Sequence, residues 1–305
     1  MQVIATYHGA CLDGSAAAAV LKMRYPQAKL VSVKSRVHQD AKEEVIKLVE
    51  THKEEGVELY MLDNPFFARE FAQLGVKLTI IDHHIGEHEN LSRLEKEFEN
   101  VKYIFDNNKS GASLAWGYFF EGKQLPKFIW HIEDGDIWRL DDEENTGKVE
   151  SYASIYLDKI DKFIEFINAD IEDLYKKGEV ALAYRDMLVD YYMRNANALH
   201  LKVGKDIIKA YNVASLRPVV SQFGNLMSQR VKEPVVMFKV FGNTVNLSFR
   251  SASEKWKPYP VDLAQSLGGN GHKLAAGATM PLDEFVKNLQ DVNKTWFKRI
   301  LNNFM

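Results

Sequence analysis

The chain is poor in cysteine, with Cys11 alone among 305 residues, which excludes an internal disulfide. So sparse a use of cysteine is typical of proteins kept in a reducing compartment. No apolar run approaches the roughly 20 residues that a membrane-spanning helix requires. No basic leader with a cleavage site precedes the first apolar run, at residues 3–7. These absences predict a cytoplasmic protein with no membrane partner.

Net charge is also low, at −3, which argues against a long channel that neutralises many DNA phosphates. The charge is unevenly distributed along the chain. Residues 198–305 contain 15 lysines and arginines against 7 aspartates and glutamates, whereas residues 1–197 contain 24 against 35. An acidic part suits cations and a basic part suits phosphates, although domains also differ in charge by chance.

Short apolar runs alternate with helical patterns over the first 110 residues. The predicted strands lie at 2–8, 29–34, 58–63, 77–82 and 101–106. The predicted helices between them lie at 14–25, 40–55 and 66–74. This alternation is typical of an α/β domain with a parallel sheet.

The rest of the chain changes character twice. Residues 111–197 are mostly helical in pattern, and a long helix is expected from 171 to 198. Two strands at 235–240 and 245–249 flank Gly242-Asn243, a hairpin signal, and helices follow at 261–267 and 282–303. We therefore predict an N-terminal domain at 1–170, a helical linker at 171–200 and a smaller C-terminal α/β domain at 201–305.

Three of the predicted strands end at acids or imidazoles. The first ends at His8, with Asp13 five residues later; the second ends at Asp63; the third ends at Asp82-His83-His84. The carboxyl ends of parallel strands lie on one edge of a sheet, so these side chains should converge. A lone aspartate after a strand is more often a helix N-cap than a ligand, but the whole set predicts a metal site.

Carboxylates with a few imidazoles suit Mn²⁺ or Mg²⁺, and the scarcity of thiolates argues against structural zinc. Two ions about 4 Å apart, bridged by one carboxylate, could clamp a phosphoryl group and activate water. Asp63 is the natural bridge because its strand is expected between the other two. A further acidic cluster contains Asp134 and Asp136, and either or both could contribute.

The C-terminal half offers a candidate anion site. Gly269 and Gly271 precede His272, and glycines let backbone amides approach an anion closely. Arg250 ends the hairpin and can bind a phosphate through two hydrogen bonds. A glycine-rich turn alone is usually only a tight loop, but the basic charge of this half favours phosphate.

Two further features have a structural and a functional interpretation. Trp256, Tyr259 and Phe249 could each stack on a base, although each is individually more typical of a core. Ser110 is predicted to cap the helix that follows it, and a helix start can also receive phosphate. The structural interpretation of Ser110 is preferred.

Two motifs together carry a family resemblance. The chain resembles the DHH phosphoesterase superfamily in the tripeptide Asp82-His83-His84. It resembles the glycine-rich motif of the associated DHHA1 domain in the run Gly268-Gly269-Asn270-Gly271-His272-Lys273-Leu274-Ala275-Ala276-Gly277. The resemblance covers nearly the whole chain. Within the superfamily, the chain is most similar to the NrnB-like branch, which belongs to a subgroup of oligoribonucleases (nanoRNases) and cyclic nucleotide phosphodiesterases. The patterns that carry this similarity are His8-x-x-Cys11-x-Asp13-Gly14, Ser110-Gly111-Ala112 and Asp136-Ile137-Trp138. The resemblance implies a catalytic DHH domain and a substrate-binding DHHA1 domain.

The resemblance also implies roles for single residues. The implied metal ligands are His8, Asp13, Asp63, His83 and Asp136, with Asp134 as the fallback for the last. Asp82 and His84 are implied to be catalytic, Asp82 by supporting the site and His84 by orienting the substrate or leaving group. Substrate would be bound by Arg250, Gly269, Gly271 and His272. The implied cofactor is Mn²⁺, with Mg²⁺ as an alternative.

One position departs from the family pattern. Many relatives carry a carboxylate where this chain has Cys11. A thiol there could ligate Mn²⁺ weakly or act as a small buried filler, and the filler is favoured. The number of ions, one or two, therefore stays open.

The expected activity is hydrolysis of short oligonucleotides to mononucleotides, by attack of hydroxide on phosphorus. The alternative substrates are pAp or a cyclic dinucleotide. A different class is a non-catalytic nucleotide sensor that has lost a metal through Cys11. The expected partners are thus a short oligonucleotide or nucleotide, and the chain could also form a homodimer.

Overall fold

The computed structural model describes residues 1–34, 39–215 and 217–290. The chain divides into two compact units, Met1–Ala183 and Tyr184–Met305. The division falls within the long helix α9 (Ile171–Asn195), which occupies most of the range predicted as a linker. Among the described residues, no helix combines the length and the apolar character needed to cross a membrane.

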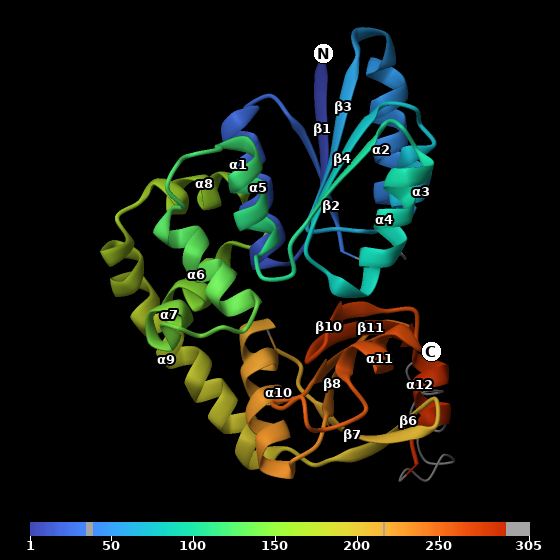
Figure 1. Ribbon diagram of the computed structural model, residues 1–305. Coiled ribbons are helices and arrows are strands. Elements are labelled where there is room, and N and C mark those ends of the chain that lie inside the picture. Colours follow the sequence, from blue (N-terminus) through green and yellow to red (C-terminus); the bar gives the residue numbers. More distant parts are fainter. Residues whose placement is uncertain (35–38, 216, 291–305) are drawn as a thin grey trace. The chain divides into compact units, whose positions relative to one another are not determined.

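The first unit contains a five-stranded sheet in the order β2-β1-β3-β4-β5, with every neighbouring pair parallel (Figure 1). Its strands are β1 (Gln2–His8), β2 (Lys29–Val33), β3 (Val57–Leu62), β4 (Lys77–Asp82) and β5 (Val101–Phe105). Each of the five predicted strands is confirmed to within one residue at either end. The parallel α/β architecture predicted from the sequence is confirmed as well.

Helices cover both faces of this sheet, which explains why its strands are near-continuous apolar runs (Figure 1). One face packs against α1 and α5, and the other against α2, α3 and α4. On the first side α6 and α8 pack against α1, and α7 packs against α6. Their bounds are α1 (Leu12–Arg24), α2 (Gln39–His52), α3 (Ala68–Ala72), α4 (His88–Glu97), α5 (Gly111–Phe119), α6 (Lys127–Asp136), α7 (Glu143–Ala153) and α8 (Ile160–Asn168). Single 3₁₀ turns lie at Lys53–Glu55, Ile85–Glu87 and Ser154–Tyr156.

The helix predicted at 66–74 is shorter in the structure. Phe67 has φ of 66°, in the left-handed region, so a right-handed helix cannot pass through it. The helix therefore begins at Ala68 and ends at Ala72. The prediction for 111–197 as mostly helical is confirmed by α5 to α9.

Small side chains bring α1 close to its neighbours. The four alanines Ala16–Ala19 are completely buried in the core that α1 shares with β1, α5 and α8. Because alanine has only a methyl group, backbones can approach closely there. This packing brings the first turn of α1 beside the first turn of α5, where Asp13 and Gly111 meet.

The second unit contains a six-stranded sheet in the order β10-β11-β9-β8-β7-β6. β7 and β8 are parallel and the other neighbouring pairs are antiparallel. One face packs against α10 and the C-terminal part of α9, and the other against α11 and α12. The bounds are β6 (Leu199–Val203), β7 (Asp206–Asn212), α10 (Arg217–Val231), β8 (Val235–Phe241), β9 (Thr244–Arg250), α11 (Pro260–Gln265), β10 (Asn270–His272), β11 (Ala275–Pro281) and α12 (Leu282–Asn288).

The predicted hairpin is confirmed as β8 and β9, with Gly242 at φ of 53° in the turn. The helix predicted at 261–267 corresponds to α11. The helix predicted at 282–303 is observed only as α12, which ends at Asn288, and residues 291–303 lie outside the described residues. Strands β6, β7, β10 and β11 complete the smaller α/β unit but were not predicted individually.

Candidate metal centre

The carboxyl ends of β1, β3 and β4 lie side by side because the three strands are parallel neighbours. His8 is the last residue of β1, Asp63 follows β3 directly, and Asp82 is the last residue of β4. Asp63 has φ of 52°, and its amide donates a hydrogen bond to the carbonyl of Ile81. Aspartate tolerates this left-handed conformation better than most residues do.

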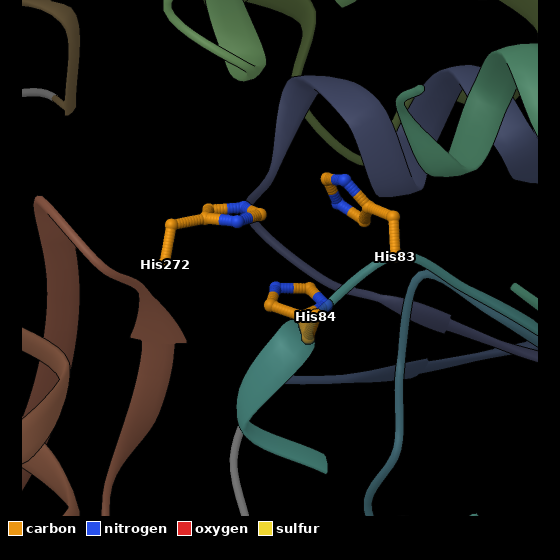
Figure 2. Close-up of side chains that lie close together, drawn as sticks. All are labelled: His83, His84 and His272. Atoms are coloured by element: carbon orange, nitrogen blue, oxygen red, sulfur yellow. The ribbon is translucent and has the colours of Figure 1, made fainter. Parts of the chain in front are cut away.

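Asp63 is the centre of the cluster. Its Oδ1 lies 3.2 Å from His83 Nε2 and 3.6 Å from His84 Nδ1, and its Oδ2 lies 3.3 Å from His8 Nδ1. The Asp63 side chain is only 1% exposed. Figure 2 shows His83 and His84 on the segment that follows β4. The structure thus brings Asp63 together with all three imidazoles that the sequence predicted around it.

Asp13 is held by the start of α5. Its two carboxylate oxygens accept hydrogen bonds from the amides of Gly111, at 2.6 Å, and Ala112, at 2.9 Å. Asp13 Oδ2 also lies 3.6 Å from His83 Nε2. Ser110 caps the same helix by accepting from the amide of Ser113, as predicted. Sequence reasoning found this cap but missed that the next two amides bind Asp13.

Asp136 and Asp134 lie in different surroundings. Asp136 Oδ2 is 3.4 Å from His83 Nε2, so Asp136 belongs to the cluster. Asp134 instead accepts hydrogen bonds from Thr146 Oγ1 at 2.7 Å and from the amide of Asp141 at 2.8 Å. Asp134 therefore organises the loop after α6, and its fully buried carboxylate is engaged there.

Two other residues complete the surroundings. His84 Nδ1 lies 2.7 Å from Oδ1 of the buried Asp82, which fixes the orientation of the His84 ring. Cys11 is 3% exposed and precedes the first residue of α1. One potential ligand atom of Cys11, one of His8 and one of Asp63 all lie within 4.8 Å of one another. The thiol is therefore buried, as a filler would be, and also within reach of the ligand atoms.

The electrostatics are those of a crowded set of acids. Burial, followed by the charges of Asp63 and Asp136, raises the pKa of Asp13 to about 8. Burial opposes ionisation of Asp63, but the imidazoles of His8 and His83 hold its pKa well below the usual value. Burial disfavours a charged His83, yet Asp63, Asp136 and Asp13 raise its pKa well above the usual value. Protons thus balance part of the negative charge, a role that a divalent cation can take over.

The donor set fits a hard divalent cation. Among the described residues of the first unit, three groups each bring three ligand atoms within 4.8 Å: Asp13, Asp63 and His83; His8, Cys11 and Asp63; and Asp63, Asp82 and His84. Within the described residues, the buried Oδ2 of Asp82 accepts no hydrogen bond, and the buried Oδ2 of Asp63 has the imidazole of His8 beside it at 3.3 Å. Carboxylate oxygens with imidazole nitrogens suit Mn²⁺ or Mg²⁺. Asp63 belongs to all three groups, as a bridging ligand would.

In the second unit, Arg250 and His272 lie on one face of the sheet. Each is opposite Ala275 of β11, Arg250 from β9 and His272 from β10. Residues directly opposite in an antiparallel ladder project to the same side, so the two flank the small side chain of Ala275. Figure 2 shows the ring of His272. Arg250 Nη2 donates to Ser221 Oγ at 3.0 Å, which orients the guanidinium.

The glycines before His272 have a packing role. A Cβ on Gly271 would lie 2.5 Å from the Cα of Ala276, and one on Gly269 would overlap the carbonyl oxygen of Gly277. Both glycines are therefore required for β10 to lie against β11. Among the candidate stacking residues, Phe249 is completely buried and belongs to the core. Trp256 and Tyr259 are half-buried.

No family model matches the chain. Among curated proteins, an uncharacterized protein of Acanthamoeba polyphaga mimivirus is 22% identical over 290 residues, which covers 90% of this chain and 66% of the viral protein. The chain therefore spans slightly less than two thirds of that relative.

Solved structures establish the fold. An exonuclease RecJ bound to manganese matches with a TM-score of 0.50 and 13% identity, over 93% of this chain and 87% of that one. RecJ from Thermus thermophilus in complex with Mn²⁺ gives the same score and identity, over 93% and 50%. CDC45 from Entamoeba histolytica matches with a TM-score of 0.50 and 9% identity, over 94% of both chains. These are DHH-superfamily folds, and the chain has a RecJ-like DHH/DHHA1 fold.

Proposed function

We propose that this chain is a metal-dependent phosphodiesterase of the NrnB-like kind that hydrolyses short oligonucleotides to mononucleotides. The observation that carries the proposal is the sharing of Asp63 by three ligand groups at the ends of β1, β3 and β4. A carboxylate in that position can bridge two cations, which is the arrangement used to clamp a phosphoryl group. The RecJ-like fold supports this proposal, since one neighbour is an exonuclease bound to manganese.

The proposed ligands are His8, Asp13, Asp63, His83 and Asp136. Mn²⁺ or Mg²⁺ bound there would neutralise charge on the phosphate and lower the pKa of water. The chain's contribution is to hold these side chains in place before substrate arrives. The amides of Gly111 and Ala112 fix Asp13, and burial keeps bulk water away from Asp63. Such preorganised electrostatics are the main contribution of a protein to phosphoryl chemistry.

We assign to Asp82 and His84 the role of orienting the substrate or the leaving group. The 2.7 Å contact between His84 Nδ1 and Asp82 Oδ1 fixes the plane of the imidazole. A carboxylate on one ring nitrogen also sets the tautomer, so that the other nitrogen has a defined role toward the substrate. We assign to His84 Nε2 the hydrogen bond to the substrate or leaving group.

We assign to Arg250 and His272 the binding of the phosphate or terminal nucleotide on the 3′ side of the substrate. The guanidinium offers two parallel donors, and the imidazole offers a third from the same face of the sheet. Gly269 and Gly271 contribute by shaping the strand that presents His272. A site of this kind binds the end of a strand, which favours short substrates.

The substrate class is tested by comparing turnover of four compounds at saturating Mn²⁺: a dinucleotide, a long single-stranded RNA, pAp and c-di-AMP. We expect the dinucleotide to be hydrolysed with the highest kcat/KM. Faster turnover of pAp or c-di-AMP would replace the proposed substrate with that compound. Nucleotide binding without hydrolysis of any of the four would show a sensor and would reject the enzymatic proposal.

Substitution of Arg250 or His272 by alanine is expected to raise KM for the dinucleotide about tenfold or more, with a smaller change in kcat. The reason is that each loses a hydrogen bond to a charged phosphate, worth roughly 1.5–3 kcal/mol. Steady-state kinetics measure both constants. Lys273→Ala is the control, because Lys273 is adjacent to His272 but is exposed and paired with Glu254. Unchanged KM in both Arg250→Ala and His272→Ala would contradict the assignment.

A further inference from the structure

The connection between β1 and α1 is only three residues long, yet three residues of the metal cluster adjoin or belong to it. His8 precedes the connection, Cys11 is its last residue, and Asp13 lies in the first turn of α1. The conformation of this loop therefore contributes to the positions of all three side chains relative to Asp63.

The middle residue of the connection, Ala10, is strained. Its φ is 54°, in the left-handed region that an alanine rarely adopts because Cβ approaches the backbone. Ala10 is also exposed, so burial of its side chain does not compensate for the strain. A residue that persists in such a conformation must be held by its surroundings.

Asp158 supplies that restraint from a distant part of the chain. The amide of Ala10 donates to both carboxylate oxygens of Asp158, at 3.0 Å to Oδ1 and 3.2 Å to Oδ2. The amide of Asp158 in turn donates to Oγ of Ser15, in the first turn of α1, at 3.3 Å. Asp158 thus contacts the connection and the start of the helix that carries Asp13.

Hydrogen bonds to a carboxylate are stronger than those between neutral groups, so the contact suits a restraint on a strained loop. Tyr7 lies near the same carboxylate. Burial, followed by the charge of Asp158, raises the pKa of the Tyr7 hydroxyl to about 12, so Tyr7 stays a neutral phenol. The nearby cation Lys22 is paired with Asp161 at 2.7 Å.

We infer that Asp158 is a positioning residue for the metal centre: it holds Ala10 in its left-handed conformation and thereby sets the geometry of His8, Cys11 and Asp13. Asp158 acts through the loop and is not itself a ligand. The inference rests on the proposed metal-dependent function. Sequence reasoning gave no sign of this role, because the contact joins residues 148 positions apart.

The test is the affinity for Mn²⁺, measured by calorimetry and by the electron paramagnetic resonance of free Mn²⁺. We expect Asp158→Ala to weaken Mn²⁺ binding about tenfold or more, the effect typical of losing a group that orients a ligand. Asp158→Asn keeps an oxygen acceptor for the Ala10 amide and should retain most of the affinity. Asp161→Ala removes an equal charge from an exposed position nearby and should leave the affinity unchanged.

A second substitution separates restraint of the loop from other effects. Glycine adopts the left-handed region without strain, so Ala10→Gly should restore much of the Mn²⁺ affinity that Asp158→Ala loses. Thermal unfolding of the metal-free variants shows whether each chain is folded. If Asp158→Ala does not fold, the Mn²⁺ affinities of Asp158→Asn and of the double variant Ala10→Gly/Asp158→Ala are compared with that of the parent chain instead.

Several outcomes would overturn the inference. Wild-type affinity in Asp158→Ala would do so, and so would equal losses in Asp158→Asn and Asp158→Ala, which would indicate an effect of charge. If Ala10→Gly did not restore any of the Mn²⁺ affinity lost in Asp158→Ala, the strained loop would not be the route by which Asp158 acts. If the parent chain itself binds no Mn²⁺ and hydrolyses no phosphodiester, the proposed function fails instead.

Discussion

Substitution of Asp63 by asparagine is expected to abolish phosphodiester hydrolysis, with a loss of at least about a thousandfold in kcat. Asparagine has nearly the same shape but cannot supply the charge that three ligand groups share. The stabilisation that bound cations give to a transferring phosphoryl group is worth several kcal/mol, and each 1.36 kcal/mol is about a factor of ten. The hydrolysis rate and the number of Mn²⁺ ions bound per chain are the quantities to measure.

A matched control exists on the same sheet. Asp106 also follows a parallel strand, β5, but it accepts a hydrogen bond from the amide of Asn108 and belongs to none of the three ligand groups. Asp106→Asn should therefore keep activity near that of the parent chain. Circular dichroism shows whether both variants are folded. Substantial activity in a folded Asp63→Asn variant would exclude Asp63 as the bridging ligand.

Alanine in place of Gly111 is expected to lower activity by roughly a hundredfold, although it adds only a methyl group. The new Cβ would lie 2.7 Å from Cβ of Asp63 and 2.9 Å from Oδ2 of Asp13. Two cluster carboxylates, or the start of α5, must then shift by several tenths of an ångström. Restoring an ordinary contact of 3.4 Å to Asp63 requires a shift that approaches 1 Å, and a misplacement of about 1 Å at a reacting centre can reduce rates by about a factor of 100. Mn²⁺ affinity should fall in parallel with kcat.

The same helix provides the control for this substitution. A Cβ on Gly117, six residues further along α5, would meet no described atom within 4 Å. Gly117→Ala should therefore leave activity unchanged and raise the free energy of unfolding by about 0.4–1 kcal/mol, because alanine restricts the unfolded chain. If Gly111→Ala were as active and as stable as Gly117→Ala, the close approach of α5 to Asp63 would be refuted.

The sequence predicted the first unit well because its strands carry a strong local signal. Buried parallel strands are continuous apolar runs, and each run in this sheet ends at a polar residue. In the second unit the signal is weaker. β10 has only three residues, Asn270–His272, and is rich in glycine, so its pairing with β11 depends on close backbone packing that no periodicity reveals.

The roles within the site depend on contacts between distant residues. Asp134 and Asp136 are two positions apart near the end of α6, which places them on nearly opposite sides of a helix with 3.6 residues per turn. Only the tertiary partners, Thr146 for Asp134 and His83 for Asp136, distinguish them. The amides that hold Asp13 likewise come from residues about a hundred positions away, and no pattern in the sequence connects them.

The four buried alanines of α1 have a consequence for how this chain can change over time. Ala16–Ala19 perform no chemistry, yet their methyl groups determine how far α1 stands from its neighbours and hence where Asp13 meets Gly111. A larger side chain among them would push a cluster carboxylate out of register even if the protein remained folded. Evolutionary drift in this inert segment is therefore constrained by the geometry of the carboxylate cluster as well as by stability.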